Sequence, residues 1–203
     1  MTPPRRTAFV AADRLAGWVE RFTLAHHGLS SQELADDGVR LAMRDGAVAV
    51  VAPPWPDDGR PGRGADPLER IVSVAMQERR LGLLLVRRGG YGVGVSVAGE
   101  LLAHKVGTAS ARSRGGDQGA AVVEKTVEEA AKAFAGQSFE YLATGGDKQL
   151  IDAVLAAPPL KRHAMAPRLA PLAVADPNMA VLRKAAADFC ALRIQITDPD
   201  TNG

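Results

Sequence analysis

The chain has 203 residues, of which 46% are hydrophobic and 24% charged, and its formal net charge is +2. This composition suits one medium-sized globular domain, or a core domain with a small N-terminal companion. So mild a charge excludes a protein that binds nucleic acid over its whole surface, which means that any basic site has to be local. No apolar run approaches the ~20 residues that span a bilayer, and the N-terminal stretch lacks the apolar segment of a signal peptide. We therefore expect a cytoplasmic protein without a membrane partner.

The cysteine and the histidines give no sign of a metal site or a disulfide. Cys190 is the only cysteine and lies in an apolar run, which predicts a buried, reduced thiol. The four histidines have no zinc-ligand spacing with one another or with that cysteine. We expect neither a metal nor a cofactor.

The N-terminal part predicts a small α+β module. Residues 6–11 have the pattern of a short strand, and residues 13–28 place apolar side chains at helical spacing before a terminating glycine. Two short strands, residues 39–43 and 47–52, follow and are separated by Arg-Asp-Gly, which favours a hairpin turn.

A segment rich in Pro, Gly and Asp follows at residues 53–67 and shows no periodicity. Such a composition is typical of a linker or a long flexible loop. We therefore predict an N-terminal module at residues 1–56, a linker at 57–66 and a second domain at 67–198.

The second domain begins with a predicted helix and a three-stranded meander. Asp66 has the position of a helix N-cap, with proline at the first helical position after it. Residues 81–88, 91–97 and 100–106 read as three strands, separated by Gly-Gly and Ala-Gly breaks that suit tight turns. Short turns between consecutive strands predict an antiparallel meander.

The rest of the domain alternates helices with strands. Residues 119–135 form the clearest amphipathic helix of the chain, and a strand at 139–145 and a helix at 147–157 follow it. A helix near 178–188 and an apolar strand at 190–196 complete the pattern. The predicted fold class is α/β (α+β), with a mixed β-sheet that contains an antiparallel meander and is covered by helices.

Two glycine-rich stretches resemble nucleotide-binding loops only superficially. Glycines 90, 92 and 94 alternate within a strand, whereas a dinucleotide fingerprint needs a helix to begin at its glycines. Glycines at that period favour close packing of another backbone or a helix. The stretch at 144–150 joins a strand to a helix but has aspartate as the N-cap, so we interpret it as a plain connection.

The connection from residue 107 to residue 118 is the strongest candidate site. It is long for a compact domain, contains Arg112 and Arg114, and has almost no apolar side chain. Lys105 precedes it and Lys125 follows it, so a basic patch forms that suits phosphate contacts. From the residues alone, a plain flexible loop and a ligand-binding loop remain open.

Two glycines and a glutamine give this loop its specific character. Gly115 and Gly116 permit backbone conformations in which main-chain N–H groups approach a ligand closely, and Gln118 stands at the start of the helix. The order of meander, basic Gly-Gly-x-Gln loop, amphipathic helix and strand resembles the Vms-like release-factor (VLRF) family, in its small actinobacterial branch. The resemblance extends over residues 80–196, with RSRGGDQG as its most specific motif and PLKRH at 159–163 as a further echo.

The resemblance implies a fold, an activity and partners. The family is related to the catalytic middle domain of eukaryotic and archaeal class 1 release factors, which implies an RNase H-like domain here. It also implies a peptidyl-tRNA hydrolase that cleaves the ester between nascent peptide and tRNA on stalled ribosomes or large subunits. Gln118, Gly115 and Gly116 then match the catalytic motif, while Asp117 departs from the small polar residue found in many members.

The same resemblance makes Arg112, Arg114, Lys105 and Lys125 candidate RNA contacts. Two alternatives remain open at this point. One is a tRNA nuclease that acts near the terminal CCA, for which the loop offers only Asp117 as a general base. The other is a non-catalytic module that grips ribosomal RNA through the basic loop. The oligomeric state is also open.

Overall fold

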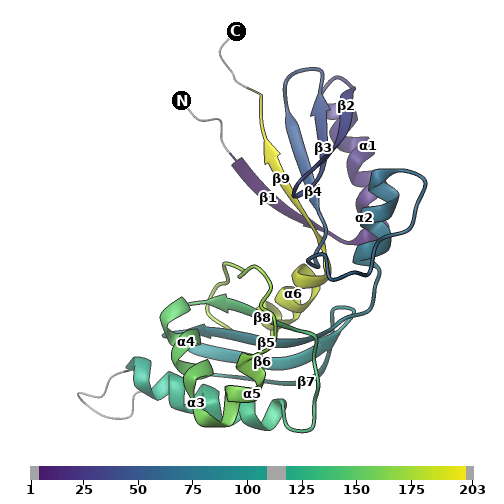
Figure 1. The fold of residues 1–203 in the computed structure, drawn as a ribbon. Coiled ribbons are helices and arrows are strands. Elements are labelled where there is room, and N and C mark those ends of the chain that lie inside the picture. Colours follow the sequence, from purple (N-terminus) through teal and green to yellow (C-terminus); the bar gives the residue numbers. More distant parts are fainter. Residues whose placement is uncertain (1–4, 109–117, 200–203) are drawn as a thin grey trace. The chain divides into compact units, whose positions relative to one another are not determined.

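The computed structural model describes residues 5–108 and 118–199. They form a mixed α/β protein with a five-stranded antiparallel sheet, a mixed four-stranded sheet and six α-helices. The chain divides into two compact units, and the segment Glu78–Phe189 is the second of them. The first unit contains the described residues up to Gln77 and those from Cys190 onward. Figure 1 labels the elements of both units.

The first unit is built on the five-stranded sheet, whose order is β1-β9-β4-β3-β2. Its strands are β1 (Arg5–Val10), β2 (Leu29–Ala35), β3 (Gly38–Met43), β4 (Val48–Ala52) and β9 (Leu192–Thr197). Alternate residues of β3, namely Val39, Leu41 and Met43, are buried, as expected of a strand with one face toward a core. The same core receives Leu15 and Phe22 from a helix.

Two helices complete the core of the first unit. They are α1 (Leu15–Ala25), which follows the short 3₁₀ helix η1 (Ala12–Arg14), and α2 (Pro67–Ala75). The Asp66 carboxylate accepts a hydrogen bond from the Glu69 backbone N–H at 3.0 Å, which confirms Asp66 as the N-cap of α2.

The sequence predicted most of this unit. The hairpin of β3 and β4 and the helix before it are confirmed. The strand β2 was missed, because its residues (LSSQELA) are mostly polar and it lies at the edge of the sheet with little burial. Cys190 lies at the end of α6 and is partly exposed, so the prediction that it is buried was wrong.

The division of the chain differs from the predicted domain limits at both ends. The helix α2 contributes Ile71 and Ala75 to the core of the first unit. Strand β9, which the sequence analysis placed in the second domain, pairs with β1 and β4. Sequence order therefore misplaces this strand, because its partners are formed by the opposite end of the chain.

The second unit is built on the four-stranded sheet, with the order β7-β6-β5-β8. Its strands are β5 (Arg80–Arg87), β6 (Gly90–Val97), β7 (Glu100–Gly107) and β8 (Tyr141–Gly146). The strands β5, β6 and β7 pair antiparallel, which confirms the predicted meander, and β8 joins β5 in parallel.

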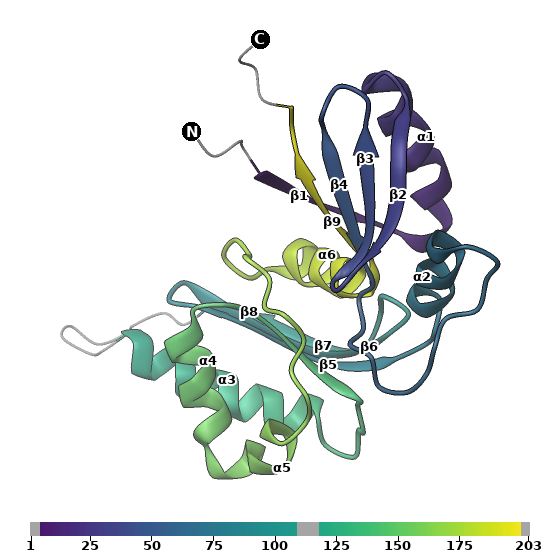
Figure 2. The same ribbon diagram turned by 45° about the horizontal axis from the view of Figure 1, so that its top comes forward.

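Helices cover both faces of this sheet (Figure 2). They are α3 (Gln118–Ala133), α4 (Lys148–Ala156), α5 (Lys161–Ala164) after the 3₁₀ helix η2 (Pro158–Leu160), and α6 (Met179–Cys190). One face packs against α3 and α4 through Tyr91, Val93 and Leu142. On the other face Gly92 comes close to Leu182 of α6.

The two glycine-rich stretches have the structural roles predicted for them. A Cβ on Gly94 would lie 2.7 Å from the Ala103 carbonyl oxygen, and one on Gly92 would lie 3.5 Å from the Leu182 side chain. Gly94 therefore lets the neighbouring strand pack closely, whereas a Cβ at Gly92 would make only an ordinary contact with α6. Asp147 caps α4 by accepting hydrogen bonds from the backbone N–H groups of Gln149 and Leu150.

Candidate catalytic loop

The candidate loop joins the end of β7 to the start of α3. Arg112, Arg114, Gly115 and Gly116 lie outside the described residues. Gln118 is described: it is the first residue of α3, and its side chain is exposed. The helix therefore begins at the candidate glutamine.

The order of the strands places the end of β7, where the candidate loop begins, close to the turn between β5 and β6. Arg87 pairs with Gly90 and Tyr91 pairs with Gly107, so the carboxyl ends of β5 and β7 lie at the same end of the sheet, on either side of the start of β6. The chain leaves the sheet toward the loop at this edge (Figure 1). Residues of the β5–β6 turn are therefore neighbours of the loop's starting point.

Tyr91 connects the start of the loop with α3. Its side chain is 2% exposed, and a Cβ on Gly107 would lie 2.4 Å from its hydroxyl oxygen. Burial raises the pKa of Tyr91, and the nearby carboxylate of Glu129 on α3 raises it further. Tyr91 thus lies over the last residue of β7 and within electrostatic reach of α3, so it stays neutral at physiological pH.

Lys105 lies on the exposed edge strand of the sheet. It pairs with Val93 of β6, whose side chain faces the core under α3, so Lys105 lies on the α3 face. The side chain is exposed and makes no ion pair with the other residues that the structure describes. Its ammonium group is available to an anionic partner beside the loop.

Lys125 has a different electrostatic environment. Its Nζ lies 2.6 Å from Glu128 Oε2 and 3.3 Å from Glu129 Oε1. Lys132 contacts the same two carboxylates, and hydrogen bonds from both lysines lower the pKa of Glu128 to about 2. The quartet of Lys125, Glu128, Glu129 and Lys132 has no net charge, so Lys125 adds little to a basic patch.

Two arginines of the β5–β6 turn were missed in the sequence analysis. Arg87 forms an ion pair with Asp176 at 3.1 Å and donates a hydrogen bond to the Val174 carbonyl oxygen. Arg88 is exposed and forms no ion pair within the described part of the chain. The available signal was the sequence Arg-Arg-Gly-Gly at the end of a predicted strand, which we interpreted only as a turn.

These arginines border a small polar hollow of about 430 Å³ at the same edge of the sheet. Its lining residues are Arg87, Arg88, Gly89, Gly146, Asp147 and Asp176. Asp176 is engaged by Arg87, and Asp147 by the backbone of α4. Of the two arginines that line the hollow, Arg88 is thus the one that forms no ion pair with a described carboxylate.

The basic passage at 159–163 has a structural role through His163. The His163 ring packs against Phe134 and Phe139, with a centroid distance of 5.2 Å to each. Burial lowers the pKa of His163, and the positive charge of Arg162 lowers it further. Arg162 donates a hydrogen bond to His163 Nε2 at 2.9 Å, which fits a neutral ring. His163 therefore belongs to the core beneath the end of α3.

The described residues contain no cluster of three or more His, Cys, Asp or Glu side chains that could hold a metal ion. Nor do they contain a helix both long and apolar enough to cross a membrane.

Comparisons with known proteins bear on the same region. No curated protein sequence matches the chain. A family model described as Actinobacteria/chloroflexi VLRF1 release factor matches residues 110–195. The match begins ahead of Gln118, runs through α3, β8, α4, α5 and α6, and ends within β9. Residues 110–195 therefore resemble this release-factor family, which is a family of translation, as the motif predicted.

Proposed function

We propose that the protein is a peptidyl-tRNA hydrolase that frees nascent peptides on stalled ribosomes or large ribosomal subunits. The family match is the observation that carries this proposal, because the matched segment contains the loop and Gln118. We further propose that the second unit has the fold of the release-factor middle domain, of the RNase H-like type, and that the protein acts in the cytoplasm. We place the proposed activity in the second unit, Glu78–Phe189, and not in the whole predicted domain 67–198, because α2 and β9 belong to the first unit.

The position of Gln118 suits stabilisation of an oxyanion. The first backbone N–H groups of an α-helix have no acceptor within the helix, and the helix dipole places partial positive charge at the same end. The helix α3 has 16 residues and begins at Gln118. Attack of water on the ester carbonyl creates negative charge on its oxygen, which the Gln118 N–H stabilises as a donor. The side-chain amide of Gln118 restricts and orients the attacking water.

The glycines and arginines of the loop have supporting roles in this proposal. Gly115 and Gly116 keep the loop slender enough to enter the peptidyl-transferase centre. Arg112 and Arg114 bind phosphates of tRNA or ribosomal RNA, which contributes affinity without sequence specificity. The reaction needs no histidine or carboxylate base, because the ribose hydroxyl of the substrate relays the proton.

The described residues extend this basic patch on the sheet itself. Lys105 lies on β7 and Arg88 directly follows β5, at the end of the sheet where the candidate loop begins. Both side chains are exposed, and neither forms an ion pair with a described carboxylate. We assign them to phosphates of the tRNA acceptor end. Lys125 is a weaker RNA contact, because its carboxylate partners have to be displaced first.

The product of the reaction tests the function directly. Large ribosomal subunits that carry peptidyl-tRNA, labelled in both the peptide and the tRNA, are mixed with the protein and the products are separated. The proposal predicts free peptide and a tRNA that keeps its complete CCA end. A tRNA that loses its terminal nucleotides would contradict the proposal and indicate a tRNA nuclease. Binding to the subunits without any cleavage would contradict it as well and indicate a non-catalytic RNA-binding module.

A further inference from the structure

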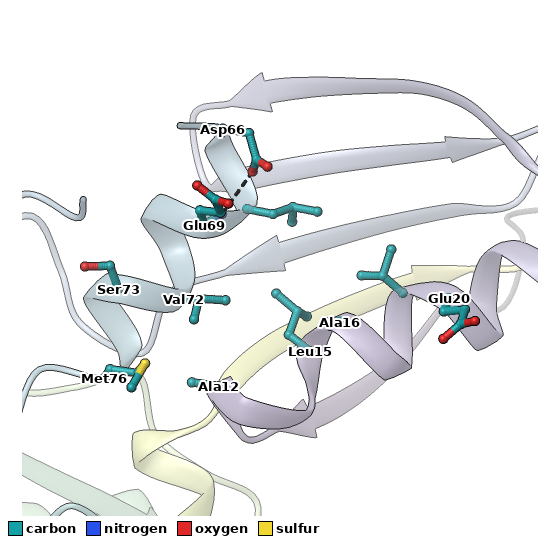
Figure 3. Close-up of a pocket in the computed structure, with 11 residues that line it drawn as sticks. Ala12, Leu15, Ala16, Glu20, Asp66, Glu69, Val72, Ser73 and Met76 are labelled. Carbon is teal, nitrogen blue, oxygen red and sulfur yellow. Dashed lines mark hydrogen bonds between the residues drawn. The ribbon is translucent and has the colours of Figure 1, made fainter. Parts of the chain in front are cut away.

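The first unit contains an open groove that the proposed chemistry does not use. It lies between α1 and α2 and has a volume of about 800 Å³ (Figure 3). Its apolar lining comes from η1, α1, α2 and the residue after α2, and consists of Ala12, Leu15, Ala16, Val19, Leu68, Val72 and Met76. Met76 is 69% exposed, although methionine is a residue that proteins normally bury. The groove is thus mainly apolar, so an apolar occupant would gain free energy from the surface that it removes from water.

The charged residues that line the groove are all acidic. Besides Ser73, the lining contains Glu20, Asp66 and Glu69 and no basic residue, although the whole chain carries a net charge of +2. The Glu69 carboxylate is held by the Ala65 backbone N–H at 2.6 Å, and the Asp66 carboxylate caps α2. Glu20 is exposed and has no ion-pair partner in the part of the chain that the structure describes.

The charged and apolar residues occupy different parts of the groove. In Figure 3, Leu15 and Val72 point toward one another from the two helices, and Ala12 and Met76 lie near one end. Asp66 and Glu69 stand at the start of α2, away from Met76. An occupant that matches this surface has apolar side chains on one face and a positive charge beside them.

We propose that this groove binds a basic amphipathic helix of a partner protein. A groove between two helices is suited to a third, because helices pack side by side at 8–10 Å through interdigitating side chains. The helix α1 has 11 residues, so it offers about 16 Å of contact length, or three helical turns. Phosphates are repelled by the three carboxylates and meet no cation in the lining, so RNA does not fit.

The proposed function indicates which class of protein supplies this helix. A protein that works on large ribosomal subunits meets RNA, which the basic edge of the second unit binds, and basic ribosomal proteins. We therefore identify the partner as a protein of the large subunit, and this identification rests on the proposed function. The groove would then bind the first unit to a ribosomal protein, while Lys105 and Arg88 of the second unit contact RNA.

Site-specific photocrosslinking on purified large subunits tests this assignment. The full-length Ala16→p-benzoylphenylalanine variant places the probe on an exposed lining residue of α1. The matched control is Ala153→p-benzoylphenylalanine, at an exposed alanine of α4. The inference predicts a crosslink from position 16, absent from position 153, to a basic amphipathic segment of a large-subunit protein. A crosslink to ribosomal RNA, a crosslink between two copies of the chain, or none would overturn it.

Charge reversal at Glu20 supplies a second readout. Adding Glu20→Lys to the probe variant should lower the crosslink yield about three- to tenfold, and Glu20→Gln should lower it less. An unchanged yield with Glu20→Lys would contradict the charge match. Co-sedimentation and peptide release are measured on the same samples. A protein that releases peptide but gives no position-16 crosslink to protein refutes this inference alone, whereas a crosslink without release refutes the proposed hydrolase.

Discussion

Gly107 and Tyr91 pack so closely at the start of the candidate loop that a side chain on Gly107 would collide with the Tyr91 ring. Its Cβ would lie 2.4 Å from the hydroxyl oxygen and 2.6 Å from Cζ. Tyr91 in turn belongs to the core that α3 covers. The last residue of β7 and the helix that begins with Gln118 are thus tied to one buried ring.

Gly107→Ala should therefore destabilise the second unit by about 1–3 kcal/mol, as overpacking of a core does. The free energy of unfolding is measured in urea by far-UV circular dichroism. Fluorescence of Trp18 and Trp55, both in the first unit, serves as an internal control. Tyr91→Leu in the Gly107→Ala background should recover part of the loss, so that the double mutant is more stable than the sum of single effects predicts. Strict additivity would show that the two residues do not meet.

Arg88→Ala should weaken binding to large subunits and flatten its salt dependence. Each phosphate contact that is lost lowers the slope of log affinity against log salt by about one. Arg183→Ala is the matched control, because Arg183 is also exposed in the second unit but lies on α6, on the opposite face of the sheet from α3. Equal slopes for the Arg88 variant and the wild type would remove Arg88 from the RNA contact.

Lys105 and Lys125 should differ in their effect on the same affinity. Lys105→Met removes an unneutralised charge and should weaken binding several-fold, whereas Lys125→Met removes a charge already paired with Glu128 and Glu129. Binding curves at two salt concentrations compare them. The Glu128→Gln variant, which frees part of the Lys125 charge, should bind more tightly than the wild type. A larger loss from Lys125→Met than from Lys105→Met would reverse this ranking.

The second unit should lose stability as the pH falls below about 6.5 because of His163. Burial and Arg162 hold the folded pKa of His163 below its ordinary value of 6.5. The unfolded chain therefore binds the proton more readily, so the contribution is complete above pH 6.5 and is lost as the pH falls toward the folded pKa. Urea unfolding of wild type and His163→Phe at pH 7.5 and 5.5 measures it. The variant should lose less stability than the wild type between pH 7.5 and 5.5. Equal losses would show that protonation of another group causes the loss of stability.

The sequence predicted local structure better than the pairing of distant segments. The meander of β5, β6 and β7 and the cap at Asp147 follow from patterns within a few residues, and the structure confirms them. The membership of β9 in the first sheet depends on its pairing with β1, about 190 residues earlier in the chain. No local pattern contains that information.

The candidate site also has features that follow from local sequence and features that depend on the fold. The Gly-Gly-x-Gln motif identified the family because its residues are contiguous. The position of Arg88 near the end of β7 depends on strand order, and the neutralisation of Lys125 depends on which side chains α3 brings within reach. Both require the three-dimensional arrangement of side chains.

The most direct measurement of the central claim is single-turnover peptide release by Gln118→Ala on large subunits loaded with labelled peptidyl-tRNA. The matched control is Gln149→Ala, an exposed glutamine in the first turn of α4. Gln118→Ala keeps the backbone N–H but removes the side-chain amide that orients the attacking water. We therefore expect it to slow release by about 10²-fold, while subunit binding stays near the wild-type value. The control should release peptide normally. Wild-type release rates for Gln118→Ala would contradict the account and leave the loop as a binding element.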